Sequence, residues 1–212
     1  RAADLRTYQD EAYAGRYREL VARARAAEAE RAPGCDGFAE AVAKAYYKLL
    51  AYKDEYEVAR LYSDGRFARA LAETFEGAPR LAVHLAPPVL GERDPATGAP
   101  VKRAFGPWML TAMRLLAPLK VLRGSLFDHL GRTAERRSER RLIAAYETLI
   151  AELIERLAPE THALAVELAS LPLKIRGFGH VKAQAIAQTK TNEAELLVRL
   201  RATSEPRAKA AE

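Results

Sequence analysis

The sequence has little of what redox or metal chemistry requires. Among its 212 residues there is one cysteine, Cys35, and there are four widely separated histidines: His84, His129, His162 and His180. A disulfide within the chain, a multi-cysteine zinc site and an iron–sulfur cluster are therefore excluded. Cys35 falls in the turn-forming run Pro-Gly-Cys-Asp-Gly, and the histidines lack metal-ligand spacing. We expect an incidental thiol, and histidines at the surface or at helix ends.

Long apolar runs are also missing. No stretch approaches the ~18 apolar residues that a membrane-spanning helix needs, and no apolar signal core opens the chain. We therefore predict a soluble, cytoplasmic protein that does not bind membranes. The chain begins at Arg1 without a Met and within a helical pattern, so we expect it to be a piece of a longer protein.

Candidate catalytic groups are equally sparse. Ser125, in Gly-Ser-Leu, lacks the strand–turn–helix context of a nucleophile. Asp54, Glu55 and Glu57 could form an acid/base cluster, but neighbouring residues on a helix point to different faces. We therefore interpret these carboxylates as part of a solvated surface.

Helix-forming residues, by contrast, are abundant. Alanine occurs 43 times, arginine 25 times and lysine 9 times, and apolar residues make up 49% of the chain. This composition favours a soluble, mainly α-helical fold. The formal net charge of +6 says little about partners, because arginines spread over solvated helix faces give the same value.

Apolar periodicity predicts a multi-helix, bundle-like domain. We predict helices over residues 2–31, 38–62, 67–75, 107–118, 142–157, 161–171 and from a glycine-rich segment to about 201. The clearest apolar stripe runs from Leu142 to Leu157 at helical spacings, and Pro118 kinks or ends its helix. We expect one helical domain over 1–202 and a disordered tail over 203–212.

Between residues 79 and 106 the pattern changes. Two short apolar segments, 80–85 and 101–105, flank two prolines and a polar turn at 93–98. These signals predict a small β-hairpin or an extended arm around residues 80–105. Because a lone hairpin is marginally stable in water, we expect it to lie on its own helices or on another domain.

The most distinctive segment is Ile-Arg-Gly-Phe-Gly-His-Val-Lys at residues 175–182. Glycine permits positive φ, and the first N–H groups of a following helix carry partial positive charge. The segment is therefore either a glycine-rich turn between two helices, or an anion cradle or docking corner. Its candidate anion-binding or interface residues are Arg176, Gly177, Phe178, Gly179, His180 and Lys182. Phe105 and Trp108 are further candidate interface residues, unless they complete the local core.

Five arginines form the densest basic group: Arg132, Arg136, Arg137, Arg140 and Arg141. Pairs of them four residues apart share a helix face, which could contact phosphates. Glu135 and Glu139 interrupt the group, and no aromatic residues alternate with it. A solvated or inter-domain face is the better interpretation, and nucleic-acid association is the weaker one.

Three strings, in this order, carry a resemblance to a known family: residues 52–62, residues 102–108 (Lys-Arg-Ala-Phe-Gly-Pro-Trp) and residues 171–182. The first reads Tyr-Lys-Asp-Glu-Tyr-Glu-Val-Ala-Arg-Leu-Tyr. Together they resemble the C-terminal region of the large, fused indolepyruvate ferredoxin oxidoreductases of bacteria, and the likeness spans about residues 10–202. The resemblance implies a parent enzyme that oxidatively decarboxylates aryl 2-oxo acids to acyl-CoA and passes the electrons to ferredoxin.

The resemblance also implies where the cofactors of such an enzyme bind. Thiamine diphosphate, magnesium and iron–sulfur clusters belong to upstream domains in that family, so we transfer no catalytic, cofactor or metal residue to this chain. We predict an accessory, structural C-terminal domain that packs against the catalytic domains of the same polypeptide or against a second subunit, within a homo-oligomer of a parent enzyme that reduces ferredoxin. Its expected contact surfaces are the hairpin region at residues 79–106 and the corner at residues 176–182. An anion- or CoA-binding module at residues 176–182 is the alternative.

Overall fold

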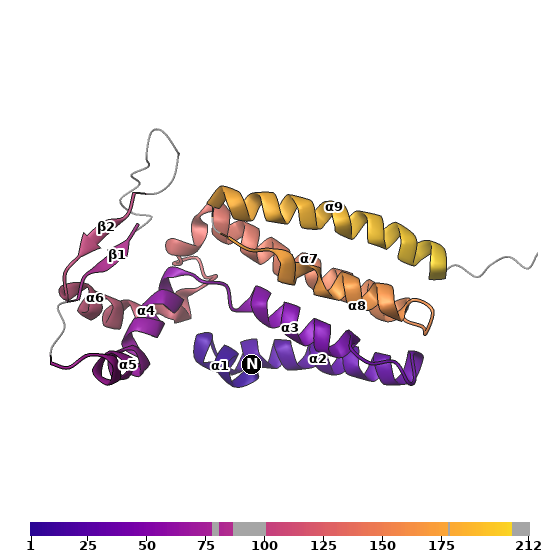
Figure 1. Ribbon diagram of the computed structural model, residues 1–212, viewed down its shortest axis with the longest axis horizontal. Coiled ribbons are helices and arrows are strands. Elements are labelled where there is room, and N and C mark those ends of the chain that lie inside the picture. The colour runs from indigo at the N-terminus through magenta and orange to yellow at the C-terminus, as the bar shows by residue number, and fades with distance from the viewer. Residues whose placement is uncertain (78–80, 87–100, 178, 205–212) are drawn as a thin grey trace, which may run out of the picture. The chain divides into compact units, whose positions relative to one another are not determined.

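Capping residues and apolar stripes produce helices along most of the chain (Figure 1). In the computed structural model, the described residues are 1–77, 81–86, 101–177 and 179–204. The α-helices within them are α1 (Ala2–Tyr8), α2 (Glu11–Arg31), α3 (Phe38–Leu50), α4 (Glu55–Ser63), α5 (Arg66–Thr74), α6 (Trp108–Leu116), α7 (Ala134–Glu155), α8 (His162–Ser170) and α9 (Gly179–Ser204). The predicted mainly α-helical fold is confirmed. None of these helices, in the part of the chain described, is long and apolar enough to cross a bilayer.

The two strands of the predicted hairpin are present and pair with each other. Strands β1 (Val83–Leu85) and β2 (Arg103–Phe105) run antiparallel, with Val83 opposite Phe105. The turn predicted at residues 93–98 lies outside the described residues. Short 3-10 helices follow elsewhere: η2 (Ala117–Leu122), η3 (Leu130–Arg132) and η4 (Leu171–Lys174). As predicted, α6 ends next to Pro118, whose ring and missing N–H cannot continue an α-helix.

Two predicted helices are each divided in two. The stretch 2–31 breaks where Asp10 accepts a hydrogen bond from the backbone N–H of Tyr13 at 2.8 Å and starts α2. The stretch 38–62 breaks where Asp54 accepts one from the N–H of Glu57, also at 2.8 Å, and starts α4. The predicted continuity was wrong because a capping aspartate begins a new helix even when apolar residues recur on both sides of it.

The described residues group into two compact units. Unit 1 comprises residues 1–52 and 138–212, and unit 2 comprises residues 53–137. The single domain expected over 1–202 stays a prediction. Residues 203 and 204, which were predicted to belong to a disordered tail, are instead the end of helix α9, and residues 205–212 lie outside the described residues.

Unit 1 has a large apolar core. Figure 1 shows α2, α3, α7, α8 and α9 with their long axes roughly aligned. The largest fully buried side chains of this unit are Tyr8, Tyr46, Phe38, Leu5, Leu50, Ile150, Leu153, Leu168, Leu171 and Leu200. The rings of Tyr17, Tyr46 and Tyr146 stack in series, with centroids 6.1 and 6.0 Å apart. The apolar stripe predicted over 142–157 supplies one wall of this core.

Unit 2 has a much smaller apolar core. Its buried cluster, among the residues described, consists of Ala59, Val83 and Met113, with partly buried side chains of α4, β1, α6 and η2 packed around them. Helix α6 therefore turns its Met109 and Met113 face towards α4. A unit with few buried apolar groups depends more on polar contacts or on a partner surface for its stability.

Candidate functional site

The predicted corner at residues 175–182 is built around Lys48 of α3, in unit 1. The Nζ of Lys48 donates hydrogen bonds to the carbonyl oxygens of Pro172, Leu173 and Ile175, at 2.9, 2.9 and 2.6 Å. Carbonyls at a helix end have no partner within the helix, so this ammonium group closes the end of η4. Burial, and then the neighbouring cations of the corner, lower the pKa of Lys48.

The glycines of the corner are required by backbone conformation. Gly177 has φ +91°, and a Cβ there would lie 2.6 Å from Cγ1 of Val181. Gly179, at φ +55°, begins α9. Both positions fit the predicted glycine-rich turn between two helices. Phe178, which belongs to the same prediction, lies outside the described residues.

The charges of the corner are partly neutralised within the chain. Lys182 pairs with the buried carboxylate of Glu139 on α7, whereas Arg176 and His180 are exposed. The carboxylate that Lys182 binds leaves less positive charge for an external anion. The anion- or CoA-binding alternative stays a prediction.

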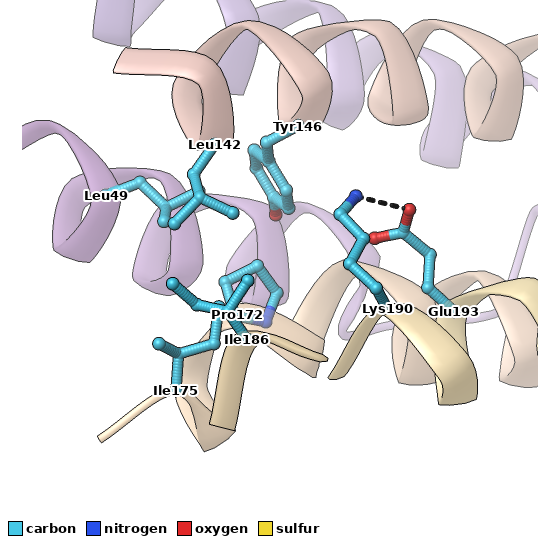
Figure 2. Close-up of a pocket in the computed structure, with 8 residues that line it drawn as sticks. All are labelled: Leu49, Leu142, Tyr146, Pro172, Ile175, Ile186, Lys190 and Glu193. Atoms are coloured by element: carbon cyan, nitrogen blue, oxygen red, sulfur yellow. Dashed lines mark hydrogen bonds and ion pairs between the residues drawn. The ribbon is translucent and has the colours of Figure 1, made fainter. Parts of the chain in front are cut away.

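A shallow, mainly apolar pocket lies beside the corner (Figure 2). Its lining residues are Leu49, Leu142, Tyr146, Pro172, Ile175, Ile186, Lys190 and Glu193. Nζ of Lys190 donates to Oε1 of Glu193 at 2.6 Å, and the hydroxyl of Tyr146 donates to the carbonyl of Ala169 at 2.8 Å. Because these polar groups already have partners, the pocket offers a ligand apolar contact but little to orient it.

In the acidic group at residues 54–57, Asp54 is buried, Glu55 and Glu57 are partly buried, and all three carboxylates are paired, so the interpretation as a solvated surface was wrong. The carboxylate of Asp54 accepts from Nε of Arg123 at 2.6 Å and from Nη2 at 3.0 Å, and both side chains are buried. Glu57 pairs with Arg60 at 2.6 Å. Each carboxylate has its own cation, which is the arrangement of a structural network and not of an acid/base pair.

Three of the arginines at 132–141 also donate hydrogen bonds within unit 2. Arg136 donates to Oε1 of Glu55 at 3.2 Å, and both side chains are largely buried. Arg132 donates to the carbonyl of Leu126 at 2.5 Å, and Arg137 donates to the carbonyl of Arg132. Of the two alternatives predicted for this group, the solvated face was therefore wrong for Arg136, and the inter-domain face stays a prediction. Nucleic-acid association stays the weaker prediction, because these guanidinium groups already bind acceptors of the protein.

His162 is a helix-end histidine, as predicted, but it is buried. It begins α8, and its Nε2 lies 2.9 Å from Oε1 of Glu28 on α2. The same carboxylate accepts from the N–H groups of Phe38 at 2.6 Å and Ala39 at 3.0 Å, which open α3. Burial by itself raises the pKa of Glu28, but the hydrogen bonds from His162, Ala39 and Phe38 outweigh it and lower the pKa. One carboxylate thus joins three helices.

The lowered pKa of Glu28 predicts that unit 1 is less stable in acid. A carboxyl group whose pKa is lower in the folded chain than in the unfolded chain stabilises the folded state. Its contribution is complete above the unfolded-chain pKa of about 4.3, and it is lost as the pH falls through the pKa of the folded chain. We expect Glu28→Gln to flatten the decline in the free energy of unfolding between about pH 5 and 3. Urea unfolding at a series of pH values measures this, with Glu30→Gln on the same helix as control. An unchanged slope in Glu28→Gln would contradict the assignment.

Metal-ligand clusters are absent from the described residues. No three His, Cys, Asp or Glu side chains there are placed to hold one ion. Cys35 is a partly buried free thiol in the turn before α3.

Unit 2 exposes large apolar side chains along residues 101–127. The exposed fractions are 61% for Trp108, 73% for Leu115, 84% for Leu126 and 71% for Phe127. Trp108 and Leu115 are seven residues apart on α6, on the face opposite the buried Met113. Helix α6 is therefore apolar on both sides, although only one side is covered. A helix that is apolar all round is normally buried.

The two predicted interface residues lie together at the start of α6. The rings of Phe105 and Trp108 meet edge to face, with centroids 5.9 Å apart and planes at 82°. Phe105 is partly buried on β2, but Trp108 stays in solvent and does not complete the local core. The ring of Phe105 instead supports the exposed indole of Trp108 from one side.

The exposed residues 126–127 are held at the tip of a tightly bonded turn. The buried carboxylate of Asp128 accepts from the N–H groups of Gly124 at 2.7 Å and Gly131 at 2.8 Å, and from the hydroxyl of Tyr56 at 3.1 Å. A Cβ at Gly131 would lie 2.0 Å from Oδ2 of Asp128. Burial and the charge of Asp128 raise the pKa of Tyr56 to about 12, so its hydroxyl remains a donor at neutral pH.

Comparison with known proteins gives a family but no activity. The model of a family of unknown function, DUF6537, matches residues 1–195. The chain belongs to this family. No curated protein and no solved structure matches it. The DUF6537 match covers most of unit 1 and the whole of unit 2.

Sequence reasoning found some of the site residues of this DUF6537 chain and missed others. It identified Phe105 and Trp108 but not Leu126, Phe127 or the positioning lysine, Lys48. A signal for the missed tip is present, because no Asp or Glu occurs between residues 95 and 127 while large apolar residues are frequent there. Such a segment is unlike a solvated loop. No comparable signal marks Lys48, whose acceptors lie more than 120 residues away.

Proposed function

We propose that this chain is a non-catalytic accessory domain of a larger enzyme similar to the fused bacterial indolepyruvate ferredoxin oxidoreductases. In this proposal, the parent enzyme converts aryl 2-oxo acids to acyl-CoA and reduces ferredoxin. Thiamine diphosphate, magnesium and iron–sulfur clusters bind to its other domains. The three strings at residues 52–62, 102–108 and 171–182, which occur in the order seen in that family, support the assignment.

The observation that carries a docking role is the exposure of apolar side chains in unit 2. Trp108, Leu115, Leu126 and Phe127 face solvent, while the core of the same unit is small. Covering a side chain of this size stabilises by about 1.5–3 kcal/mol before the costs of association. Large apolar groups on rigid supports are typical anchors of protein interfaces. We infer that unit 2 packs on the catalytic domains of the same polypeptide.

Separating the chain from the rest of the parent enzyme tests this role. The two parts are produced as separate polypeptides, and their affinity is measured by light scattering and by titration. We expect them to associate, and we expect Leu126→Ser with Phe127→Ser to weaken the affinity about 30-fold or more, because interface hot spots contribute at least about 2 kcal/mol. Reduction of ferredoxin by the remainder of the enzyme is measured in parallel, with and without the chain.

The matched control is Val198→Ser, which removes an exposed apolar side chain from α9 of unit 1. It is expected to leave the affinity unchanged, and circular dichroism confirms that each variant keeps its helices. The docking role is rejected if the wild-type parts fail to associate and the remainder is fully active alone.

A further inference from the structure

Residues 101–127 combine exposed apolar groups with charge of one sign. This segment contains two lysines, three arginines and neither aspartate nor glutamate, so all 28 acidic residues of the chain lie outside it. A second segment, residues 168–192, also lacks acidic residues, but there Lys182 pairs with Glu139 and Lys190 pairs with Glu193. A surface segment of 27 residues without an acidic group therefore has a local potential that the net charge of +6 does not convey.

Most of this positive charge lies beside the apolar anchors. Arg123 is neutralised by Asp54 and is buried, so it contributes little to the surface. Lys102, Arg103 and Arg114 are exposed. The first two lead into Phe105 on the strand side, and Arg114 precedes Leu115 on α6. Apolar centres with a polar, charged rim are the usual anatomy of a protein interface.

The anchors are also preorganised. Trp108 is braced edge to face by Phe105, and the tip at 126–127 is fixed by three hydrogen bonds to Asp128 and one from Arg132. Rigid anchors lose little conformational entropy on binding a shaped partner. A lipid surface, in contrast, accepts apolar groups in any arrangement and gains nothing from such support. The geometry therefore favours a protein partner.

We propose that residues 101–127 bind a protein surface whose apolar centre is flanked by aspartate and glutamate side chains. This inference rests on the proposed docking role and specifies the chemistry of the docked surface. The cations steer the encounter and set its orientation, and the apolar anchors supply most of the stability of the complex.

Charge reversal tests whether the partner surface has an acidic rim, that is, flanking aspartate and glutamate side chains. It does so separately from whether docking occurs at all. The full chain carrying Lys102→Glu, Arg103→Glu and Arg114→Glu is mixed with the remainder of the parent enzyme, and association is followed by stopped flow. We expect the association rate at low ionic strength to fall about tenfold or more, and the difference from wild type to shrink at about 0.5 M salt because of screening. The control reverses Arg6, Arg23 and Arg25, which are exposed on unit 1 and give the same change in net charge. It is expected to change the rate less than about threefold.

The outcomes separate this inference from the proposed function. If the serine variants at 126 and 127 lose affinity but the charge-reversed chain binds like wild type at every salt concentration, docking stands and the acidic rim is rejected. If neither the serine variants nor the charge-reversed chain changes binding, the docking role and the acidic rim are both rejected. Charge-dependent binding to vesicles containing anionic phospholipid, without binding to the protein, overturns the inference in favour of a lipid surface. Self-association that Leu115→Ser abolishes overturns it in favour of a second copy of the chain.

Discussion

Replacing Asp54 with alanine is expected to destabilise unit 2 by about 3–5 kcal/mol, because it removes from the buried guanidinium of Arg123 the carboxylate that neutralises it. The two hydrogen bonds from Arg123, at 2.6 and 3.0 Å, join residues that are both nearly inaccessible to water. The same substitution removes the cap of α4, where Asp54 accepts from the N–H of Glu57 at 2.8 Å. Urea unfolding, followed by circular dichroism and by the fluorescence of Trp108, measures the loss.

A second capping aspartate provides the matched control for this prediction. Asp10 caps α2 with the same geometry and the same 2.8 Å distance, but it is exposed. Asp10→Ala is therefore expected to lower the stability of unit 1 by only about 1 kcal/mol, the usual contribution of an N-cap.

Removing both members of the buried pair tests the physical reason directly. Asp54→Leu combined with Arg123→Met is expected to be less destabilising than Asp54→Ala, because no charge is then left buried alone. Equal losses in Asp54→Ala and Asp10→Ala, or a double variant worse than Asp54→Ala, would show that the Arg123 pairing contributes little.

Replacing Glu28 with alanine is expected to destabilise unit 1 by about 2–4 kcal/mol. Glu28 accepts the N–H groups of Phe38 and Ala39, and the N-cap of α3 is Gly37, which has no side chain to replace it. The substitution also removes the partner of the buried His162. Hydrogen bonds to a charged group contribute about 1.5–3 kcal/mol, and unpaired buried donors are costly.

The control for this prediction lies two residues further along α2. Glu30 is exposed, so Glu30→Ala is expected to change the free energy of unfolding by less than about 0.5 kcal/mol. Glu28→Gln keeps the size of the side chain and one acceptor oxygen, and we expect an intermediate loss. Denaturant unfolding gives all three values. A Glu28→Ala variant as stable as Glu30→Ala would mean that the hydrogen bonds of Glu28 do not contribute to holding α2, α3 and α8 together.

Local sequence patterns were sufficient for most helices but not for their boundaries. The stripe over 142–157 and the stop at Pro118 follow from side-chain periodicity and proline geometry, both of which act within a few residues. The breaks before α2 and α4 were not predicted, because apolar residues recur at helical spacing on both sides of each capping aspartate. Asp54 with Glu57 three residues later is a recognisable start signal.

The site residues also divide into those that local sequence patterns identified and those whose surroundings such patterns did not predict. Aromatic and glycine content singled out residues 105–108 and 176–182, but charge pattern gave the wrong environment for the acidic group at 54–57. Whether a carboxylate is solvated depends on which cation the folded chain brings to it. Arg123 lies 69 residues from Asp54, and His162 lies 134 residues from Glu28. Nothing local in the sequence specifies such pairs.

By itself, the sequence determined a mainly helical chain with a short hairpin, one thiol and an acid-free apolar segment at 101–127. These features depend on composition and on short-range periodicity, which are set before the chain folds. Only the tertiary structure decided that Lys48, Glu28, Asp54 and Asp128 are structural, and that Trp108, Leu115 and the 126–127 tip remain in solvent. Burial and pairing depend on contacts between segments distant in sequence, and those contacts exist only once the helices pack.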